Sequence, residues 1–152
     1  MIRFLVMDVD GTLTDGKIYM SNNGELFKAF DIKDGTGIHD IAIPSGIEPV
    51  IITGRDSLIV KKRCDELGIK MVFQGVRNKA ECLENAVDSL KDVAYIGDDI
   101  NDLECMNMVK NSGGVVGCPA DAADEVVQIA DFISIRKGGD GAVREFIKWL
   151  IR

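Results

Sequence analysis

The stretch Phe4-Leu-Val-Met-Asp8-Val-Asp10-Gly-Thr12 indicates the fold, because a short apolar run leads directly into two carboxylates. A continuous apolar run of this length is typical of a strand that is buried on both faces of a parallel sheet. Further runs of this kind predict five more strands, over 49–53, 71–73, 93–96, 115–116 and 132–135.

The segments between these runs have the spacing of amphipathic helices. Apolar residues recur at this spacing over 83–90 and 143–151, and we also predict helices over 56–68, 101–111 and 121–130. Strands that alternate with helices predict an α/β fold, a doubly wound Rossmann-like parallel sheet.

The segment after the first strand breaks this alternation. Lys17-Ile-Tyr-Met20 and Glu25-Leu-Phe-Lys-Ala-Phe30 flank Ser21-Asn-Asn-Gly24, which predicts a β-hairpin with an Asn-Gly turn, inserted over about 15–32. Because the loops that follow the strands carry function in this type of fold, we expect the hairpin to project over the functional site.

The composition limits the class of protein. The 152 residues fit one domain, 1–152, and the contents of 46% hydrophobic and 28% charged residues are those of a soluble globular protein. The net charge of −7 argues against a nucleic-acid partner and against docking on anionic membranes. The four cysteines form no Cys-x-x-Cys pair and the N-terminal apolar run is too short for a signal peptide, so we expect a cytoplasmic protein.

Carboxylates follow two of the predicted strands. Strand alternation would place Asp8 and Asp10 on the same side, and Gly97-Asp98-Asp99-Ile-Asn-Asp102 follows the strand over 93–96. In a doubly wound sheet the two loops can meet at the switch point and form an oxygen-rich site suited to Mg²⁺. Each cluster alone is equally compatible with turn and helix-cap residues. The two together favour a metal site.

Two further polar residues lie at the end of a predicted strand and at the start of a predicted helix, positions from which they could contribute to a binding site. Thr53 ends the second predicted strand, and its hydroxyl and the following amides could bind a phosphoryl oxygen or cap a helix. Lys79 opens a predicted helix, where the helix dipole disfavours a cation, so it is either functional or a solvated surface lysine.

These motifs resemble those of a known family in order and spacing. Asp8-x-Asp10-Gly-Thr, Thr53-Gly, Lys79 and Gly97-Asp98-Asp99-x-x-Asp102 are similar to the four motifs of the haloacid dehalogenase superfamily. Further stretches extend the likeness over nearly the whole chain, among them Lys28-Ala-Phe, Asp34-Gly-x-Gly-Ile38 and Gly138-Gly-x-Gly-Ala-Val-Arg-Glu145. They resemble the capless branch, which holds the 3-deoxy-D-manno-octulosonate 8-phosphate phosphatases and their nonulosonate 9-phosphate relatives.

The resemblance implies a Mg²⁺-dependent phosphomonoesterase with a covalent intermediate. Asp8 would attack phosphorus, and Asp10 would protonate the leaving oxygen and then activate water. The resemblance implies that the metal is held by the Asp8 carboxylate, the Asp10 carbonyl and Asp98, with Asp99 and Asp102 supporting it. Thr53 and Lys79 would hold the phosphoryl group, and Asp102 is also a candidate partner for Lys79.

The resemblance also implies a small-molecule sugar acid phosphate as the substrate. Arg55 and Arg63 are eight residues apart, which would place both on one helix face. Other candidates for binding the substrate are Asp31, Lys33, Asp34, Gly35, His39, Gly54 and Lys79. Relatives carry arginine where this chain has His39, and the alternative to substrate binding is that His39 has a structural role. Arg63 could equally be solvated or contact another subunit.

Other readings stay open beside the octulosonate 8-phosphate phosphatase. They are a nonulosonate 9-phosphate phosphatase, a non-catalytic assembly module like the domain attached to acylneuraminate cytidylyltransferases, a phosphotransferase or mutase, and a receiver domain. By resemblance we expect a homotetramer built through the hairpins over 17–30. The end of the sequence at Arg152, where relatives often continue, leads us to expect looser closure over the substrate.

Overall fold

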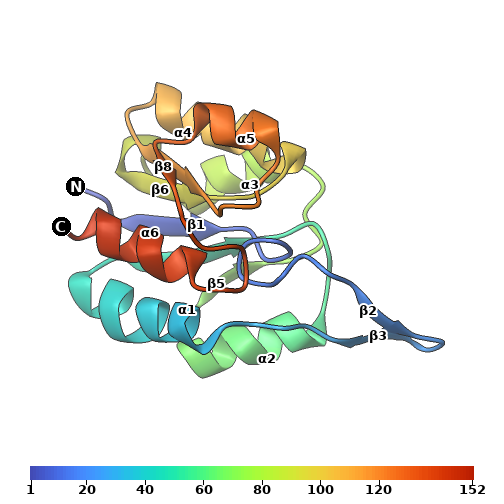
Figure 1. Cartoon of the computed structure of the whole chain (residues 1–152). Coiled ribbons are helices and arrows are strands. Elements are labelled where there is room, and N and C mark those ends of the chain that lie inside the picture. Colours follow the sequence, from blue (N-terminus) through green and yellow to red (C-terminus); the bar gives the residue numbers. More distant parts are fainter.

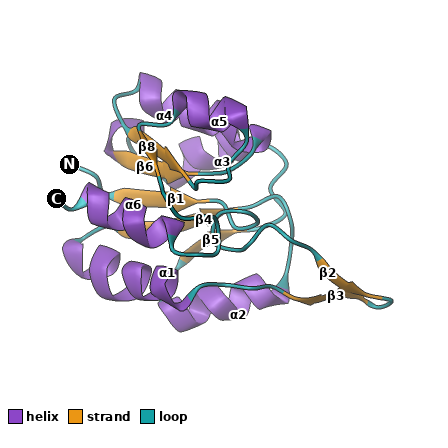
Figure 2. Cartoon of the chain, viewed as in Figure 1, coloured by secondary structure: helices purple, strands orange, loops and turns teal.

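The computed structural model describes residues 1–152 and places one parallel sheet between two layers of helices (Figures 1 and 2). The strand order is β5-β4-β1-β6-β7-β8, and every neighbouring pair runs parallel. The strands are β1 (Phe4–Met7), β4 (Glu48–Ile52), β5 (Met71–Phe73), β6 (Val93–Ile96), β7 (Val115–Cys118) and β8 (Phe132–Ile133). The predicted α/β architecture is therefore confirmed.

The helices cover both faces of the sheet (Figure 2). One face carries α1 (Ile32–Thr36), the π-helical turn η1 (Gly37–Ala42), α2 (Leu58–Leu67) and α6 (Ala142–Leu150). The other carries α3 (Lys79–Ala86), α4 (Leu103–Asn111) and α5 (Asp124–Ile129). Short 3-10 turns complete the chain at Ile43–Ser45, Leu90–Asp92 and Ile100–Asp102 (η4). None of the helices combines the length and the apolar character that a membrane crossing requires.

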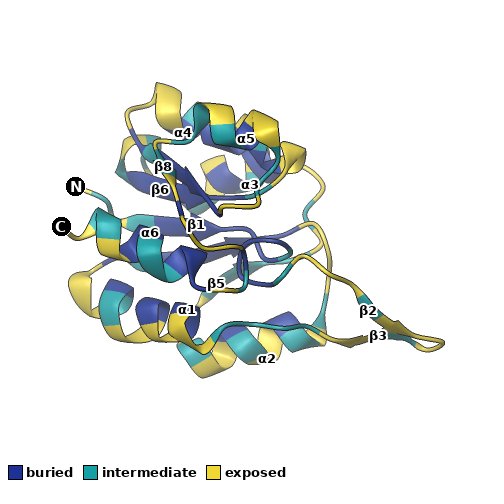
Figure 3. Ribbon diagram, viewed as in Figure 1, coloured by how far each residue is buried: buried dark blue, intermediate teal, exposed yellow.

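Strand alternation divides the core into two parts. In β1, Leu5 and Met7 belong to the buried cluster that contains residues of α2 and α6, whereas Val6 belongs to the cluster that contains residues of α3 and α4. The four central strands, β4, β1, β6 and β7, are largely buried on both faces (Figure 3), which explains why their sequences are continuous apolar runs.

Several predicted boundaries were wrong. The strand predicted over 132–135 ends at Ile133, and the helix predicted to open at Lys79 and to continue to Leu90 ends at Ala86, with Val87 extended. The helical segment over 32–45 was not predicted. Its signal is weak because Ile38 and Ala42 are its only fully buried apolar residues and two glycines, Gly35 and Gly37, interrupt it.

The hairpin consists of β2 (Tyr19–Ser21) and β3 (Gly24–Phe27), and an isolated bridge between Thr14 and Phe30 closes its root. The turn residues are Asn22 and Asn23 rather than an Asn-Gly pair, because Gly24 pairs with Ser21 and takes the positive φ of 109°. The hairpin extends away from the sheet (Figure 1), and it approaches the site that we expected it to cover through Lys28 at its root and Glu25 in β3.

The chain reverses its winding direction at β1. The strands that follow β1 along the chain, β4 and β5, lie on one side of it, and the later strands β6 to β8 lie on the other. Ligands bind in such sheets outside the carboxyl ends of the two strands at this switch point. Asp8 follows β1 and Asp98 follows β6 by two residues, so both lie at this crevice.

Phe146 offers a test of the layer formed by α6. It is fully buried, its ring stacks with Trp149, and Gly117 of β7 lies so close that a Cβ there would be 2.7 Å from the ring. We expect Phe146→Ala to lower the free energy of unfolding by about 3–5 kcal/mol because it leaves a cavity. Urea unfolding measures the change. Ile151→Ala, at the half-exposed end of the chain, is the control, and an equal loss in both variants would contradict this packing.

Candidate active site

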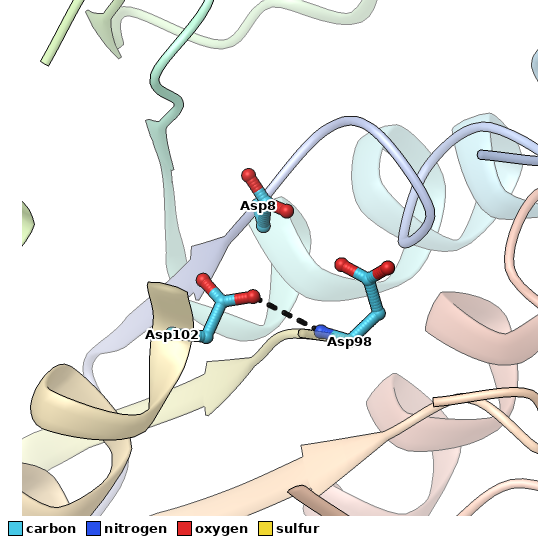
Figure 4. Close-up of side chains that lie close together, drawn as sticks. All are labelled: Asp8, Asp98 and Asp102. Carbon is cyan, nitrogen blue, oxygen red and sulfur yellow. Dashed lines mark hydrogen bonds between the residues drawn. The ribbon is translucent and has the colours of Figure 1, made fainter. Parts of the chain in front are cut away.

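Three carboxylates meet at the switch point of the sheet (Figure 4). Asp8, Asp98 and Asp102 each offer an oxygen, and these oxygens lie within 4.8 Å of one another. Asp8 directly follows β1, Asp98 comes two residues after β6, and Asp102 ends the turn η4. The predicted convergence of the two acidic loops is therefore present.

The cluster is electrostatically unfavourable in the absence of a cation. Burial, together with the charge of Asp102, raises the pKa of Asp8 to about 6, although Lys79 and a backbone hydrogen bond at Val9 act in the opposite direction. Burial and the charge of Asp8 raise the pKa of Asp98 to about 8. Like charges in a poorly solvated site are relieved by a bound cation, and carboxylate oxygens are the ligands that Mg²⁺ prefers. The residues present fit a Mg²⁺ ion.

Lys79 supplies the positive charge of the site. It is the first residue of α3, whose N-cap Asn78 accepts a hydrogen bond from the backbone N–H of Glu81. Its Nζ lies 3.0 Å from Asp8 Oδ1 and 3.0 Å from Asp102 Oδ1, so the suggested contact with Asp102 is present. A cation at the N-terminus of a helix is disfavoured by the helix dipole. Here the two carboxylates compensate for this cost and for the burial of the ammonium group.

Asp102 holds the other groups of the cluster in place. Its Oδ1 accepts hydrogen bonds from Lys79 and, at 2.7 Å, from the hydroxyl of Tyr95, while Oδ2 accepts from the backbone N–H groups of Asp98 (3.1 Å) and Asp99 (3.4 Å). Four donors occupy this carboxylate, so it orients its neighbours. Sequence reasoning missed Tyr95, whose signal is a hydroxyl within the otherwise apolar β6.

The turn after Asp10 is shaped by Asp98. Gly11 has a φ of 86°, and a Cβ there would lie 1.9 Å from Asp98 Oδ2, so only glycine fits. Thr12 donates to Asp98 Oδ1 at 3.3 Å, and Thr14 Oγ1 accepts from the backbone N–H groups of Gly11 and Gly16. The Asp-Gly-Thr motif thus places a backbone turn directly against the second acidic loop.

Asp10 lies apart from the cluster. β1 ends at Met7, so the strand alternation that we expected to place Asp10 beside Asp8 does not reach it. Its Oδ1 instead forms a 2.6 Å ion pair with Lys28, which also pairs with Glu25 at 2.9 Å. Lys28 and Glu25 were missed as site residues, although the Lys28-Ala-Phe stretch contributed to the resemblance.

Thr53 and Asp99 have different surroundings. Thr53 is buried directly after β4, and its hydroxyl forms no hydrogen bond within the protein. Gly54 lines a cavity of about 410 Å³ together with Arg77, Lys79 and Asn101. Asp99 is exposed, and its carboxylate accepts from the backbone N–H of Ile100 at 2.7 Å, as a helix cap does.

The two arginines expected on one helix face are not on one helix. The N-cap of α2 is Ser57, so Arg55 precedes the helix and the predicted alignment with Arg63 was wrong. Arg55 pairs with Glu25 at 3.5 Å. Arg63 pairs with Glu66 at 3.1 Å, and its guanidinium lies 5.8 Å from the centre of the Phe30 ring.

The segment over 31–39 lies on the face that carries α6. Asp31 caps α1 by accepting from the backbone N–H of Lys33, and Asp34 accepts from the backbone N–H of Arg144 at 3.0 Å. Burial raises the pKa of Asp34 to about 6. Gly35 packs against Arg63, and His39 is exposed beside Asp40. Neither a hydrogen bond nor an ion pair joins these residues to the carboxylate cluster.

Comparisons with known proteins find relatives by sequence and by structure, and these relatives are phosphatases or hydrolases. No protein-family model matches the chain. The 3-deoxy-D-manno-octulosonate 8-phosphate phosphatase KdsC of Escherichia coli K12 is 45% identical over 154 residues, covering 99% of this chain and 79% of that protein. The Moraxella catarrhalis enzyme of the same name, solved with magnesium, phosphate and KDO, is 36% identical with a TM-score of 0.90, covering 99% of this chain and 86% of that one. A putative hydrolase of haloacid dehalogenase subfamily III A from Legionella pneumophila is 32% identical with a TM-score of 0.89, covering 99% and 82%.

The raised pKa values of Asp8 and Asp98 predict how stability depends on pH. Between about pH 4 and about pH 8 the metal-free native state retains protons that the unfolded chain has released, so its stability should fall as the pH rises. Mg²⁺ should compensate, and it should raise the melting temperature more at about pH 8 than at about pH 5. Thermal unfolding with and without Mg²⁺ measures both effects.

Two matched variants test whether the effect of Mg²⁺ on the melting temperature comes from this site. Asp98→Asn should remove most of the Mg²⁺-dependent shift, whereas Asp65→Asn, at an exposed ion pair on α2, should retain it. A Mg²⁺ shift that is the same at both pH values would contradict the prediction.

Proposed function

This chain belongs to the 3-deoxy-D-manno-octulosonate 8-phosphate phosphatase family within the haloacid dehalogenase superfamily, and we propose that it hydrolyses a 3-deoxy-2-ulosonic acid phosphate, most readily 3-deoxy-D-manno-octulosonate 8-phosphate. The observation that carries the proposal is the contact of Lys79 with Asp8 inside the carboxylate cluster at the switch point. A buried carboxylate held by a lysine beside a metal site is suited to attack on phosphorus.

Asp8 and Asp98, with the backbone carbonyl of Asp10, would hold Mg²⁺, and Asp102 and Asp99 would support them. When bound there, Mg²⁺ supplies the positive charge that offsets repulsion between the Asp8 carboxylate and a phosphate dianion. Asp102 keeps the Asp98 backbone and Lys79 in fixed positions through its four hydrogen bonds.

Hydrolysis then proceeds as two displacements. Asp8 attacks phosphorus and becomes an aspartyl phosphate while Asp10 gives a proton to the departing sugar oxygen. Asp10 then takes a proton from the water that cleaves the aspartyl phosphate. Thr53 and Lys79 hold the phosphoryl oxygens as negative charge develops on them, and the unpaired Thr53 hydroxyl is suited to this.

The sugar acid end of the substrate needs groups further from the cluster. Arg55 is the leading candidate because it directly follows Thr53-Gly54 and its guanidinium is half exposed. We keep Arg63 and His39 as substrate contacts, together with the segment formed by Asp31, Lys33, Asp34 and Gly35. The hydrogen bond of Asp34 to the Arg144 backbone also supports a structural role for that segment.

Two alternatives differ in what they require. A nonulosonate 9-phosphate phosphatase would use the same cluster with a longer sugar, and the substrate comparison below decides this. A non-catalytic assembly module would have no need for the complete set of Asp8, Asp10, Lys79 and Asp98. We further propose a cytoplasmic location, which the four free cysteines support because thiols persist in reducing compartments.

Phosphate release tests the function. With Mg²⁺, we expect kcat/KM to be highest for octulosonate 8-phosphate, lower for nonulosonate 9-phosphates and lowest for simple sugar phosphates. Asp8→Asn should lower kcat by at least about 10³-fold because the nucleophile is lost. Asp65→Asn is the control and should match the wild type. Release by Asp8→Asn at the wild-type rate would contradict the proposed chemistry, and equal rates across the sugars would contradict the proposed substrate.

The hairpin supports a proposal about assembly. Ile18, Met20 and Leu26 are 58%, 69% and 60% exposed, although a two-stranded hairpin is marginal alone and apolar side chains there gain from being covered. We propose that hairpins of four copies associate, so that the hairpin root and a neighbouring copy enclose the substrate in a chain with no cap domain.

The oligomeric state tests this assembly. We expect the wild type to have the mass of a tetramer by light scattering and Met20→Glu/Leu26→Glu to have the mass of a smaller species. Ile151→Glu is the control because the C-terminus lies at the opposite end of the sheet (Figure 1). A monomeric wild type, or a tetramer that survives the double substitution, would exclude assembly through the hairpins.

A further inference from the structure

Lys28 is a buried cation that the reaction described above does not use. Its side chain is only 2% exposed, although it stands on the last stretch of the hairpin. Burying an ammonium group is unfavourable unless carboxylates pair with it. Its two partners are Asp10 Oδ1 at 2.6 Å and Glu25 Oε2 at 2.9 Å.

Glu25 ties this pair to a second loop of the site. Its Oε1 accepts a hydrogen bond from the hydroxyl of Ser57 at 2.8 Å, and its Oε2 lies 3.5 Å from Arg55. Ser57 is also the N-cap of α2. A continuous set of contacts thus joins the Asp10 turn to the hairpin, and the hairpin to the loop that follows Thr53.

We propose that Lys28 is a positioning residue for proton transfer by Asp10. Lys28 occupies one oxygen of the Asp10 carboxylate, Oδ1, and no protein group donates a hydrogen bond to the other oxygen, Oδ2. Lys28 therefore fixes the Asp10 carboxyl group through Oδ1, so that Oδ2 carries the proton that passes to the leaving oxygen and later takes up the proton from water. This inference rests on the proposed function, because it takes Asp10 as the acid and base.

Glu25 fixes Lys28 in turn. Without the ammonium group, the carboxylates of Asp10 and Glu25 would face each other in a half-buried site and would repel each other. The Asp10 carboxylate would then adopt other orientations, and a misplaced acid transfers a proton less efficiently. The loss should be greatest where the leaving group most needs a proton.

Aryl phosphates of nearly the same shape separate positioning from general structural damage. Phenolate leaves poorly and needs protonation, whereas 4-nitrophenolate leaves readily without it. The measured quantity is kcat/KM, which reports the step that forms the aspartyl phosphate and expels the leaving group. We expect Lys28→Met to lower kcat/KM at least about tenfold for phenyl phosphate and less than about threefold for 4-nitrophenyl phosphate.

The control variants make the result specific. Lys17→Met removes an exposed lysine of the same hairpin that forms no ion pair, and it should change neither rate. Lys28→Arg retains the charge and should recover part of the phenyl phosphate rate. Asp10→Asn should show the same selective loss as Lys28→Met, only larger. If Lys28→Met fails to fold by circular dichroism, Glu25→Gln carries the test, with a smaller loss of the same selectivity.

Two results would overturn the proposal. The first is an equal loss on both aryl phosphates in a folded variant, which would indicate a structural role only. The second is no loss on either. Failure of the proposed function would give a different result. The wild type would then show no preference for sugar acid phosphates, while the comparison of the two aryl phosphates would still report on Lys28.

Discussion

Repulsion among buried carboxylates is the constraint on which the rest of this molecule depends. The sheet brings Asp8, Asp98 and Asp102 within 4.8 Å of one another at the point where its winding reverses. Several neighbouring groups reduce or accommodate that repulsion. Lys79 is buried at a helix start to bridge two of the acids, Tyr95 and two backbone N–H groups satisfy Asp102, and Gly11 leaves room for Asp98. These contacts do not remove all of the repulsion among the three carboxylates. A divalent cation bound between them would relieve the remainder, and this relief would favour its binding.

The strands and the acidic loops could be predicted because their signals are local. An apolar run followed by carboxylates is visible in the sequence, and parallel strands bring their carboxyl ends to one edge whatever the details. The position of Asp10 could not be predicted in this way. Whether a strand ends at Met7 or continues to Asp10 depends on the hydrogen bonds of the turn, where the carbonyl of Val9 accepts from Thr12, Leu13 and Thr14.

Long-range partners account for the other misses. Nothing near Lys28 in the sequence shows that its ammonium group reaches Asp10, eighteen residues earlier, or that Tyr95 points at Asp102. The alignment of Arg55 with Arg63 was wrong because Ser57 starts the helix after Arg55, a boundary that depends on one side-chain cap. The fold thus follows from patterns along the chain, whereas the roles of individual polar residues follow from contacts that only the folded chain makes.

Glu25 has a consequence for how this site could evolve. The same carboxylate pairs with Lys28, which contacts Asp10, and with Arg55, which we propose as a contact of the sugar acid. A substitution of Arg55 that suits a different sugar would change the charge balance around Glu25 and thereby disturb the group that moves protons. From these proposed roles we expect changes in substrate range and in catalytic rate to be epistatic, so that a lineage that alters one acquires a compensating change in the hairpin.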